Sequence, residues 1–469
     1  MNFSIFENTF IKTRNYIKSV IEKDAIKGKY FEYAYPWIFS EILSNLRGEN
    51  HAYNEKTKFF QYLKFIAYEY YLQIISYFSR YKLINYDVLF WGSYSSHYKI
   101  YKTLEFDLQE NGLSYIYVTD KFALYKELKS ENKNVVFLNI NLTSKLKNTF
   151  MKSIKTNENF DLSIFNSINS KEKSFFRLDY LIKSTFEKVS PKIIITANEF
   201  LTEHRAAIII GKELKIKSIN IQHGLISNLS HLYKEMSSDL FLVYGNVTKN
   251  ILLNIGLTEE KIKVVGSLLL SNHKINSKNI ITKTSNLNVL VTMSGYGNST
   301  SYQHHINIIE AINLVACKFS NINFNVKLHR KDKIEFYKNL NNKNINIIND
   351  NDLLKTNKTF IDLVNENDAM ITTTSASMFD AFLLKKPVLG IDFYAEFKEN
   401  EFYKEGLLIV TENVVDLENN LKNLKEKPEI FEPMINKANR YLEEYYNLRC
   451  SNDTPQIKTV NQIINLIKE

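Results

Sequence analysis

The fold of this chain is decided by three short apolar runs, each of which leads into a glycine: INIQHGLISN (219–228), SSDLFLVYG (237–245) and KIKVVGS (261–267). In an open parallel sheet, ligands bind just beyond the carboxyl ends of the strands, and the strand-to-helix turns there favour glycine. His223 lies in the first of these turns, where it could touch a substrate while its backbone is held rigidly. The pattern therefore predicts an enzyme cleft bordered by Gln222, Gly224 and Gly266.

The length and composition of the chain indicate a folded protein of two domains. It has 469 residues, and a single hydrophobic core stops growing at about 250–300 residues. A hydrophobic content of 44% is ample for packed cores, which excludes a disordered chain. The net charge of +9 has two readings: a basic surface for an anionic partner, or the codon bias of an AT-rich genome. No run of five or more Lys or Arg occurs, so no nucleic-acid partner is expected.

The sequence also suggests a cytoplasmic protein. Cys317 and Cys450 are far apart and lack metal-type spacing, so neither a disulfide scaffold nor a zinc site is expected. Residues 1–18 contain no small-residue cleavage site after an apolar core, which argues against a secretory signal. No stretch approaches the ~20 apolar residues that a membrane span needs.

Residues 1–85 are expected to form an N-terminal helical segment rich in aromatic residues. Within residues 59–81, apolar side chains recur at the spacing of one helix face: Leu63, Ile66, Ala67, Tyr70, Tyr71, Ile74, Ile75 and Phe78. This face could pack on the domain behind it, or it could lie on a membrane surface with Tyr and Phe among the lipid headgroups. The sequence leaves both readings open.

From residue 86 onward, apolar strands alternate with helices, which predicts parallel sheets covered by helices. The expected divisions are a first Rossmann-like, acceptor-binding domain over 86–270, a polar linker over 271–288, a second Rossmann-like, donor-binding domain over 289–450, and a C-terminal helix over 451–469. The predicted fold class is therefore α/β, with two Rossmann-like domains that face a cleft and a helical segment before them.

Two residues of the first domain are candidates for acid–base chemistry. His223 is the leading candidate, because a neutral imidazole can take a proton from a hydroxyl as its oxygen attacks. Glu199 ends another predicted strand and could act as a base or contact an acceptor. A carboxylate exposed after a strand is the alternative reading of Glu199.

In the second domain, cationic side chains follow the predicted strand NFNVKLHR (323–330). Ammonium, imidazolium and guanidinium groups together suit a phosphate or diphosphate leaving group. Lys327, His329 and Arg330 are therefore candidate phosphate contacts. The alternative is an exposed loop that is rich in basic residues through codon bias.

Hydroxyl groups follow the next predicted strand, DAMIT (368–372), at the point where a helix is expected to begin. A helix start offers free backbone N–H groups, and Ser or Thr there can cap the helix or bind phosphate oxygens. Thr374, Ser375 and Ser377 are the candidates for this anion site. The loop SGYGNSTS (294–301) adds Ser294 and Gly295, because glycines permit close approach of a ligand to the backbone.

The order of these motifs over residues 192–469 resembles the GT-B glycosyltransferases, most closely the bacterial CDP-glycerol glycerophosphotransferases and the CMP-Kdo or CMP-sialate transferases. The resemblance is carried by His-Gly at 223–224, Lys-Leu-His at 327–329, the Ser/Thr cluster at 372–377 and Lys-Lys-Pro-Val at 385–388. It implies that His223 is the catalytic base. It also implies that His329, Ser375 and Ser377 hold the phosphate of the donor.

The expected function is that of an inverting, metal-independent glycosyltransferase that uses a nucleotide-activated sugar, with CMP- or CDP-linked donors favoured. The acceptor would be a glycan or a lipid-linked glycan of a bacterial surface polymer, which would bring the protein to the inner face of the plasma membrane. No cofactor is expected besides the donor, which is a cosubstrate. The alternatives are a nucleotide-sugar 2-epimerase, a polyol-phosphate transferase and an inactive subunit of an assembly complex.

Overall fold

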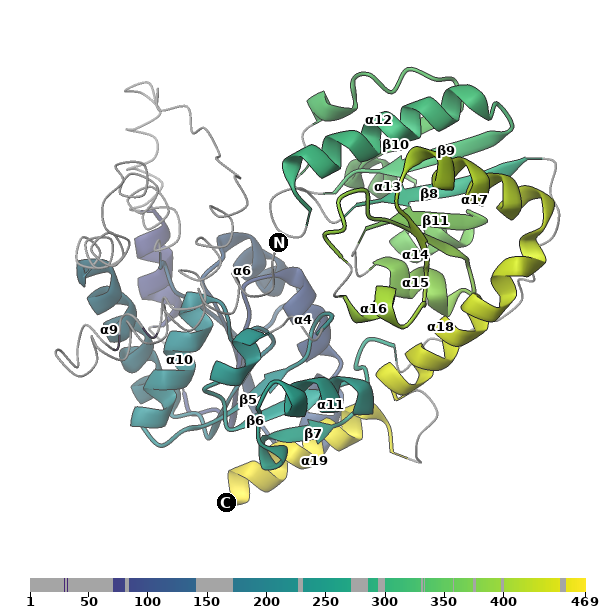
Figure 1. The fold of residues 1–469 in the computed structure, drawn as a ribbon. Coiled ribbons are helices and arrows are strands. Elements are labelled where there is room, and N and C mark those ends of the chain that lie inside the picture. Colours follow the sequence, from purple (N-terminus) through teal and green to yellow (C-terminus); the bar gives the residue numbers. More distant parts are fainter. Residues whose placement is uncertain are drawn as a thin grey trace, which may run out of the picture.

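The structure is a computed structural model. It describes Lys29, Glu32 and residues 71–80, 84–140, 172–226, 231–270, 286–293, 300–329, 332, 334–356, 358–373, 377–397, 400–447 and 453–469. Figure 1 shows two α/β lobes, each built around its own sheet. The expected α/β class with two Rossmann-like domains is confirmed.

In the described part of the chain, the first domain contains a parallel sheet of seven strands in the order β3-β2-β1-β4-β5-β6-β7. The strands are β1 (Val88–Trp91), β2 (Tyr115–Thr119), β3 (Val135–Phe137), β4 (Ile193–Thr196), β5 (Lys217–Ile221), β6 (Leu240–Val243) and β7 (Ile262–Val264). Strands β1 and β4 are buried at every residue. Their unbroken apolar runs suit a parallel sheet, because helices cover both of its faces.

Helices and short 3₁₀ segments connect these strands. They are α4 (Ser95–Lys102), α5 (Glu105–Glu110), α6 (Phe122–Ser130), α9 (Glu172–Val189), α10 (Thr202–Glu213), η1 (His231–Glu235), α11 (Asn246–Asn254) and η2 (Glu259–Lys261). Each described strand of the first sheet runs parallel to its neighbours, so all the carboxyl ends meet at one edge.

The second domain repeats this architecture with six described strands in the order β10-β9-β8-β11-β12-β13. Its strands are β8 (Leu287–Thr292), β9 (Ile322–Lys327), β10 (Ile345–Ile348), β11 (Ala369–Thr372), β12 (Val388–Ile391) and β13 (Ile409–Thr411). Its helices are α12 (Tyr302–Lys318), η3 (Ile334–Tyr337), α13 (Asp350–Lys355), α14 (Phe360–Asn365), α15 (Ser377–Leu383), α16 (Glu401–Lys404), α17 (Val414–Glu426) and η4 (Pro428–Phe431). Strand β8 begins two residues inside the segment expected to be the linker.

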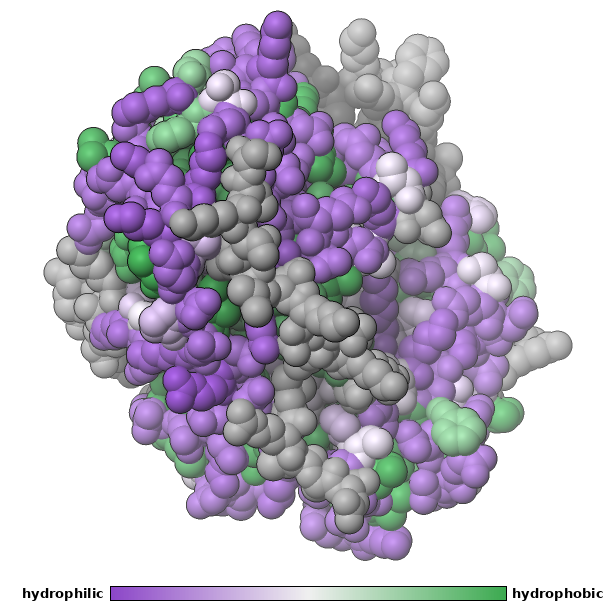
Figure 2. All heavy atoms as spheres, turned by 90° about the vertical axis from the view of Figure 1, so that its right-hand side faces the viewer, coloured by the Kyte–Doolittle hydropathy of each residue, from purple (hydrophilic) through white to green (hydrophobic). Residues whose placement is uncertain are grey.

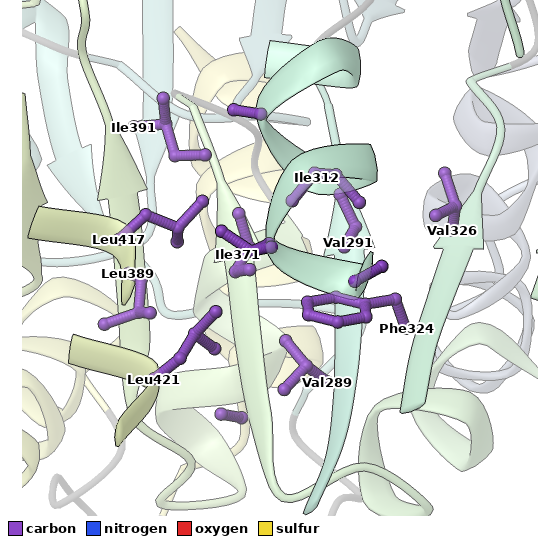
Figure 3. Close-up of a cluster of buried hydrophobic side chains, with 14 of the residues drawn as sticks. Val289, Val291, Ile312, Phe324, Val326, Ile371, Leu389, Ile391, Leu417 and Leu421 are labelled. Atoms are coloured by element: carbon purple, nitrogen blue, oxygen red, sulfur yellow. The ribbon is translucent and has the colours of Figure 1, made fainter. Parts of the chain in front are cut away.

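The core of the second domain lies between its sheet, α12 and α17. Figure 3 shows Val289 and Val291 of β8 beside Ile371 of β11, with Ile312 of α12 and Leu417 of α17 packed against them. All five side chains are buried. Burying such a side chain contributes about 1.5–3 kcal/mol, so this cluster fixes the sheet between its helices.

The C-terminal part of the chain crosses from the second domain back to the first. Helix α18 (Glu432–Tyr445) contacts both α15 and α11, and α19 (Pro455–Lys468) packs on the first domain. Val460, Ile463 and Leu466 of α19 belong to the buried core of that domain. Figure 1 shows α19 beneath the strands of the first lobe. Helix α19 is therefore part of the first domain, although it comes after the second domain in the sequence.

Residues 71–79 form a helix on which several side chains of the predicted apolar face do not pack on the domain. Tyr71, Ile74 and Phe78 are exposed, whereas Leu72 and Ser76 are buried. The reason is a pair of serine contacts with the edge strand β3 and the residues after it. The backbone N–H of Phe137 donates to Ser79 Oγ (3.1 Å), and that of Asn139 donates to Ser76 Oγ (3.3 Å). These contacts satisfy edge-strand groups that would otherwise lack a strand partner. The rest of the predicted face, residues 59–70, lies outside the described residues.

No helix within the described ranges is both long enough and apolar enough to span a membrane. Figure 2 views the molecule from the right-hand side of Figure 1, and the described residues on that face are mostly hydrophilic with scattered hydrophobic side chains. Scattered apolar residues of this kind are ordinary on a protein surface.

The approach of α18 to the first domain predicts a cost for any side chain at Gly245, which precedes α11. A Cβ atom there would lie 2.2 Å from the carbonyl oxygen of Glu444 and 2.4 Å from that of Tyr445. We expect Gly245→Ala to lower the free energy of unfolding by about 3 kcal/mol, measured by chemical denaturation, because the backbone must shift to relieve the clash. Gly224→Ala is the control, since an added Cβ meets no described atom within 4 Å. Equal stability of the two variants would contradict the close approach.

Candidate active site

The strand order gives each sheet one topological switch point. In the first sheet, successive strands are added on one side of β1 up to β3 and then on its other side from β4 onward, so the switch point lies between β1 and β4. In the second sheet it lies between β8 and β11 for the same reason. Ligands of open α/β sheets bind beyond the carboxyl ends of the strands at such a switch point. Polar side chains gather at both positions.

At the switch point of the first sheet, a serine joins an imidazole and a carboxylate. Ser93 follows β1, and its Oγ lies 2.8 Å from Nε2 of His204 in α10. The same Oγ donates to Oδ1 of Asp120, which follows β2, at 2.5 Å. Lys121 forms an ion pair with Asp120. All of these side chains except that of Lys121 are buried.

The imidazoles of His97, His204 and His223 lie together at this edge. The ring centroids are 5.4 Å apart for His97 and His204, and 5.2 Å apart for His97 and His223. Burial is the main cause that lowers the pKa of His97 to about 3, and the nearby His223 lowers it further. Burial also lowers the pKa of His204 well below its ordinary value. Both rings are therefore neutral at physiological pH.

His223 is half-buried. Burial lowers the pKa of its imidazole, while a hydrogen bond with the backbone of Ala197 acts in the opposite direction. A lowered pKa leaves the ring neutral near pH 7, which is the form that can accept a proton. The following residue, Gly224, has no described atom within 4 Å of where a Cβ would lie. The predicted turn after β5 thus presents a neutral imidazole beside an unobstructed backbone.

Glu199, the second predicted acid–base residue, has a different environment. Its carboxylate is fully buried and lies 3.2 Å from Nη1 of Arg205. It also accepts hydrogen bonds from the backbone N–H of Ser237, and from the N–H (3.1 Å) and hydroxyl (2.7 Å) of Ser238. A carboxylate held by so many donors fixes the segment before β6, so we assign Glu199 a structural role.

Gln222 and Gly266, which were expected to border the cleft, both contact the C-terminal crossover. The side chain of Gln222 is 2% exposed and donates to Gly224 O (2.9 Å) and to the hydroxyl of Tyr445 (3.1 Å). Gly266 has φ +98°, and a Cβ there would lie 2.8 Å from Cγ of Pro455. These positions are therefore explained by chain packing, because the turns after β5 and β7 meet α18 and the start of α19.

Glu203 is a buried acidic group that the sequence reasoning missed. It lies in α10, and its Oε1 has no hydrogen-bond partner among the described residues. Burial, together with repulsion from Asp120, raises its pKa to about 7, although Lys121 acts in the opposite direction. The signal that could have identified Ser93 and Asp120 is their position just after β1 and β2, and for Glu203 it is the first turn of α10, the helix that follows β4.

At the switch point of the second sheet, hydroxyl groups of two strand ends and a helix start come together. Thr292 Oγ1, at the end of β8, lies 3.2 Å from Thr372 Oγ1, at the end of β11. It also lies 2.9 Å from the Oγ of Ser377, the first residue of α15. Thr372 belongs to the Ser/Thr cluster predicted at 372–377. Thr292 is a missed contributor, and its place at the end of an apolar strand was the available signal.

Of the cationic candidates, Lys327, the last residue of β9, has a side chain that is already bonded within the chain. Nζ of Lys327 donates to Oδ1 of Asp350 (2.6 Å) and to the carbonyl of Leu328 (2.9 Å). The backbone N–H of His329 donates to Oδ2 of Asp332 (2.9 Å), which fixes this turn. A phosphate would have to compete with Asp350 for Lys327.

Five of the predicted phosphate-site residues lie outside the described residues: Ser294, Gly295, Arg330, Thr374 and Ser375. Their assignment to the donor site stays a prediction. Within the ranges that the structure describes, no three His, Cys, Asp or Glu side chains are grouped in a way that could hold a metal ion.

Solved structures share this two-domain fold. They include a UDP-GlcNAc 2-epimerase from Neisseria meningitidis bound to UDP-GlcNAc, which is 16% identical with a TM-score of 0.52 and covers 81% of this chain and 99% of that chain. Another is the MnaA–UDP structure from S. aureus, which is 17% identical with a TM-score of 0.54 and covers 82% and 98%. A third is a glycosyltransferase from Rickettsia africae, which is 15% identical with a TM-score of 0.50 and covers 82% and 99%.

At such low identities the likeness concerns the fold. The two parallel sheets and the match over nearly the whole length of the first two structures confirm the GT-B fold expected from the sequence. No protein-family model matches the chain. No curated protein matches it either. The narrower resemblance to CDP-glycerol and CMP-Kdo transferases stays a prediction.

The pKa of Glu203 predicts how stability depends on pH. Because its pKa rises from an ordinary value of 4.5 to about 7 in the folded protein, the folded state keeps a proton that the unfolded chain loses between these pH values. The free energy of unfolding should therefore fall as the pH rises from 5 to 8. Glu203→Gln removes this titration, so the variant should gain on the order of 3 kcal/mol relative to the wild type across that range.

The measurement is chemical denaturation of both proteins at each pH unit from 5 to 8. Glu310→Gln, at an exposed position of α12, is the matched control and should follow the wild-type profile. Parallel pH profiles for wild type and Glu203→Gln would mean that Glu203 does not hold a proton in the folded protein.

Proposed function

We propose that this protein is a nucleotide-sugar enzyme, and specifically a glycosyltransferase whose donor binds the second domain and whose acceptor binds the first. One observation carries the proposal. A neutral, half-buried histidine lies at the carboxyl edge of one sheet, and a cluster of hydroxyl groups lies at the switch point of the other. The first is suited to accept a proton and the second to donate hydrogen bonds to phosphate oxygens.

In the proposed reaction, an acceptor hydroxyl attacks the anomeric carbon of the donor sugar. A new C–O bond forms, and the bond between that carbon and the phosphate oxygen breaks, so that the nucleotide leaves with the electron pair. His223 takes the proton of the attacking hydroxyl. Hydroxyl donors at Thr292 and Ser377, together with His329, would stabilise the negative charge that develops on the phosphate. Attack from the side opposite the phosphate inverts the anomeric configuration, and no metal ion enters the proposal.

The donor and acceptor classes extend the same proposal. The sequence resemblance favours CMP- or CDP-linked donors, whereas the solved structures with the same fold include proteins bound to UDP or UDP-GlcNAc. Nucleotides that contain cytosine and nucleotides that contain uracil are therefore both included in the first binding test. A glycan or lipid-linked glycan of a cell-surface polymer is the proposed acceptor, reached at the inner face of the plasma membrane.

A nucleotide-sugar 2-epimerase is the second candidate. The observation that favours it is the fold shared with a UDP-GlcNAc 2-epimerase along 99% of that chain. An epimerase consumes UDP-GlcNAc without an acceptor and releases an isomer. Incubation with UDP-GlcNAc alone, followed by NMR of the sugar, separates the candidates, because a transferase leaves the configuration at carbon 2 unchanged.

Nucleotide binding should appear as thermal stabilisation. A ligand at about 100 times its dissociation constant adds about 2.7 kcal/mol to the free energy of unfolding. We expect millimolar UDP, CMP or CDP to raise the melting temperature, whereas GDP, with a larger base, serves as the comparison. A melting temperature that none of these nucleotides changes would contradict the proposed donor site.

Substitutions should separate the roles of the two domains. We expect His223→Ala to lower turnover by about 10²- to 10⁴-fold, the usual contribution of a general base. The same variant should keep the thermal shift caused by the nucleotide. Ser377→Ala should reduce that shift, because it loses a hydroxyl donor at the switch point. Ser320→Ala, at an exposed position of the same domain, is the control. Loss of nucleotide binding in His223→Ala but not in Ser377→Ala would reverse the assignment of the domains.

A further inference from the structure

The turn that carries His223 is held by a residue from the far end of the chain. The hydroxyl of Tyr445, the last residue of α18, accepts a hydrogen bond from the backbone N–H of Ile226 (3.0 Å). It also accepts one from Nε2 of Gln222 (3.1 Å). Tyr445 is fully buried. One hydroxyl thus holds the turn on both sides of His223.

Gln222 extends this contact into the turn itself. Its Nε2 also donates to the carbonyl of Gly224 (2.9 Å), and its Oε1 accepts from the backbone N–H of Tyr244 (2.9 Å). The backbone on either side of His223 is therefore tied to a single buried amide. Because that amide is in turn bonded to Tyr445, the position of the imidazole depends on where α18 lies.

The ring of Tyr445 also touches the second domain. It meets the ring of Phe379 edge-to-face, with centroids 5.1 Å apart and an angle of 82°. Phe379 lies in α15, the helix that begins at Ser377. Helix α18 contacts α15 of the second domain and α11 of the first. Tyr445 therefore lies at the contact between the domains, with its ring against one and its hydroxyl against the other.

We propose that Tyr445 is a positioning residue for His223, and that its hydroxyl fixes the 222–226 turn relative to α15 and thus to the second domain. The catalytic meaning of the proposal rests on the proposed function of His223. The geometric part does not, since it concerns only where the turn and its imidazole lie. Because this tyrosine contacts both domains, it would fix the position of the His223 imidazole relative to a ligand bound near α15.

A purely structural role for Tyr445 is the competing explanation. Its ring belongs to an aromatic cluster that also contains Tyr244, Phe379, Tyr441 and Tyr446. Tyr445→Phe separates the two explanations, because it removes the hydroxyl and keeps the ring. Tyr446→Phe is the matched control. Its ring packs on Tyr244 and Phe379 in the same cluster, but the turn residues Gln222 and Ile226 are bonded to the hydroxyl of Tyr445.

Two readouts on the full-length protein test the proposal. Hydrogen exchange by mass spectrometry follows the amides of residues 222–226, and NMR of labelled histidine follows the imidazole of His223, assigned with His223→Gln. A lost hydrogen bond of about 1 kcal/mol corresponds to roughly fivefold faster exchange of the turn. We expect that acceleration and a changed His223 signal in Tyr445→Phe, and neither in Tyr446→Phe. Circular dichroism checks that both variants keep the wild-type fold.

Unchanged exchange and an unchanged His223 signal in Tyr445→Phe would overturn the proposal. The same changes in both variants would also overturn it, because they would follow from general loosening of the aromatic cluster. Neither readout uses a nucleotide or turnover. A failure of the proposed function and a failure of the Tyr445 contact can therefore be told apart.

Discussion

The close approach of the C-terminal crossover to the first domain is the constraint on which the rest of the structure depends. Glu444 and Tyr445 lie so near the turn after β6, and Pro455 so near the turn after β7, that a Cβ at Gly245 or Gly266 would lie within 2.8 Å of them. This approach brings Tyr445 onto the turn after β5 and lets α19 join the core of the first domain. The last part of the chain thus links two sheets that are otherwise built independently, and it does so next to His223.

The two switch points differ in the chemistry of the groups they hold. The first gathers imidazoles that burial keeps neutral, together with a buried acidic group that has a pKa of about 7. The second gathers uncharged hydroxyls at strand ends and a helix start. Neutral proton acceptors suit an attacking hydroxyl, whereas hydroxyl donors suit an anionic leaving group. This difference supports the proposed division between a proton-accepting side and a phosphate-binding side.

The elements with strong apolar runs could be predicted from the sequence, whereas contacts between distant segments could not. The α/β class and the position of His223 after β5 followed from strands that end at glycines. The contacts of Gln222 with Tyr445 and of Gly266 with Pro455 could not be predicted, because these partners are far away in the sequence. The sequence left open whether the apolar face within residues 59–81 packs on the domain, and it gave no sign that Ser76 and Ser79 contact β3 and the residues after it.

A crystal structure of the protein with UDP or CDP bound would test the central claim most directly. The quantity to measure is the distance from the phosphate oxygens to Ser377 Oγ and Thr292 Oγ1. Division of the site between the two sheets predicts a phosphate oxygen within about 3 Å of at least one of these hydroxyls, with the sugar-bearing side of the phosphate directed toward His223. A nucleotide bound at the carboxyl edge of the first sheet, against His97 and His204, would contradict the account.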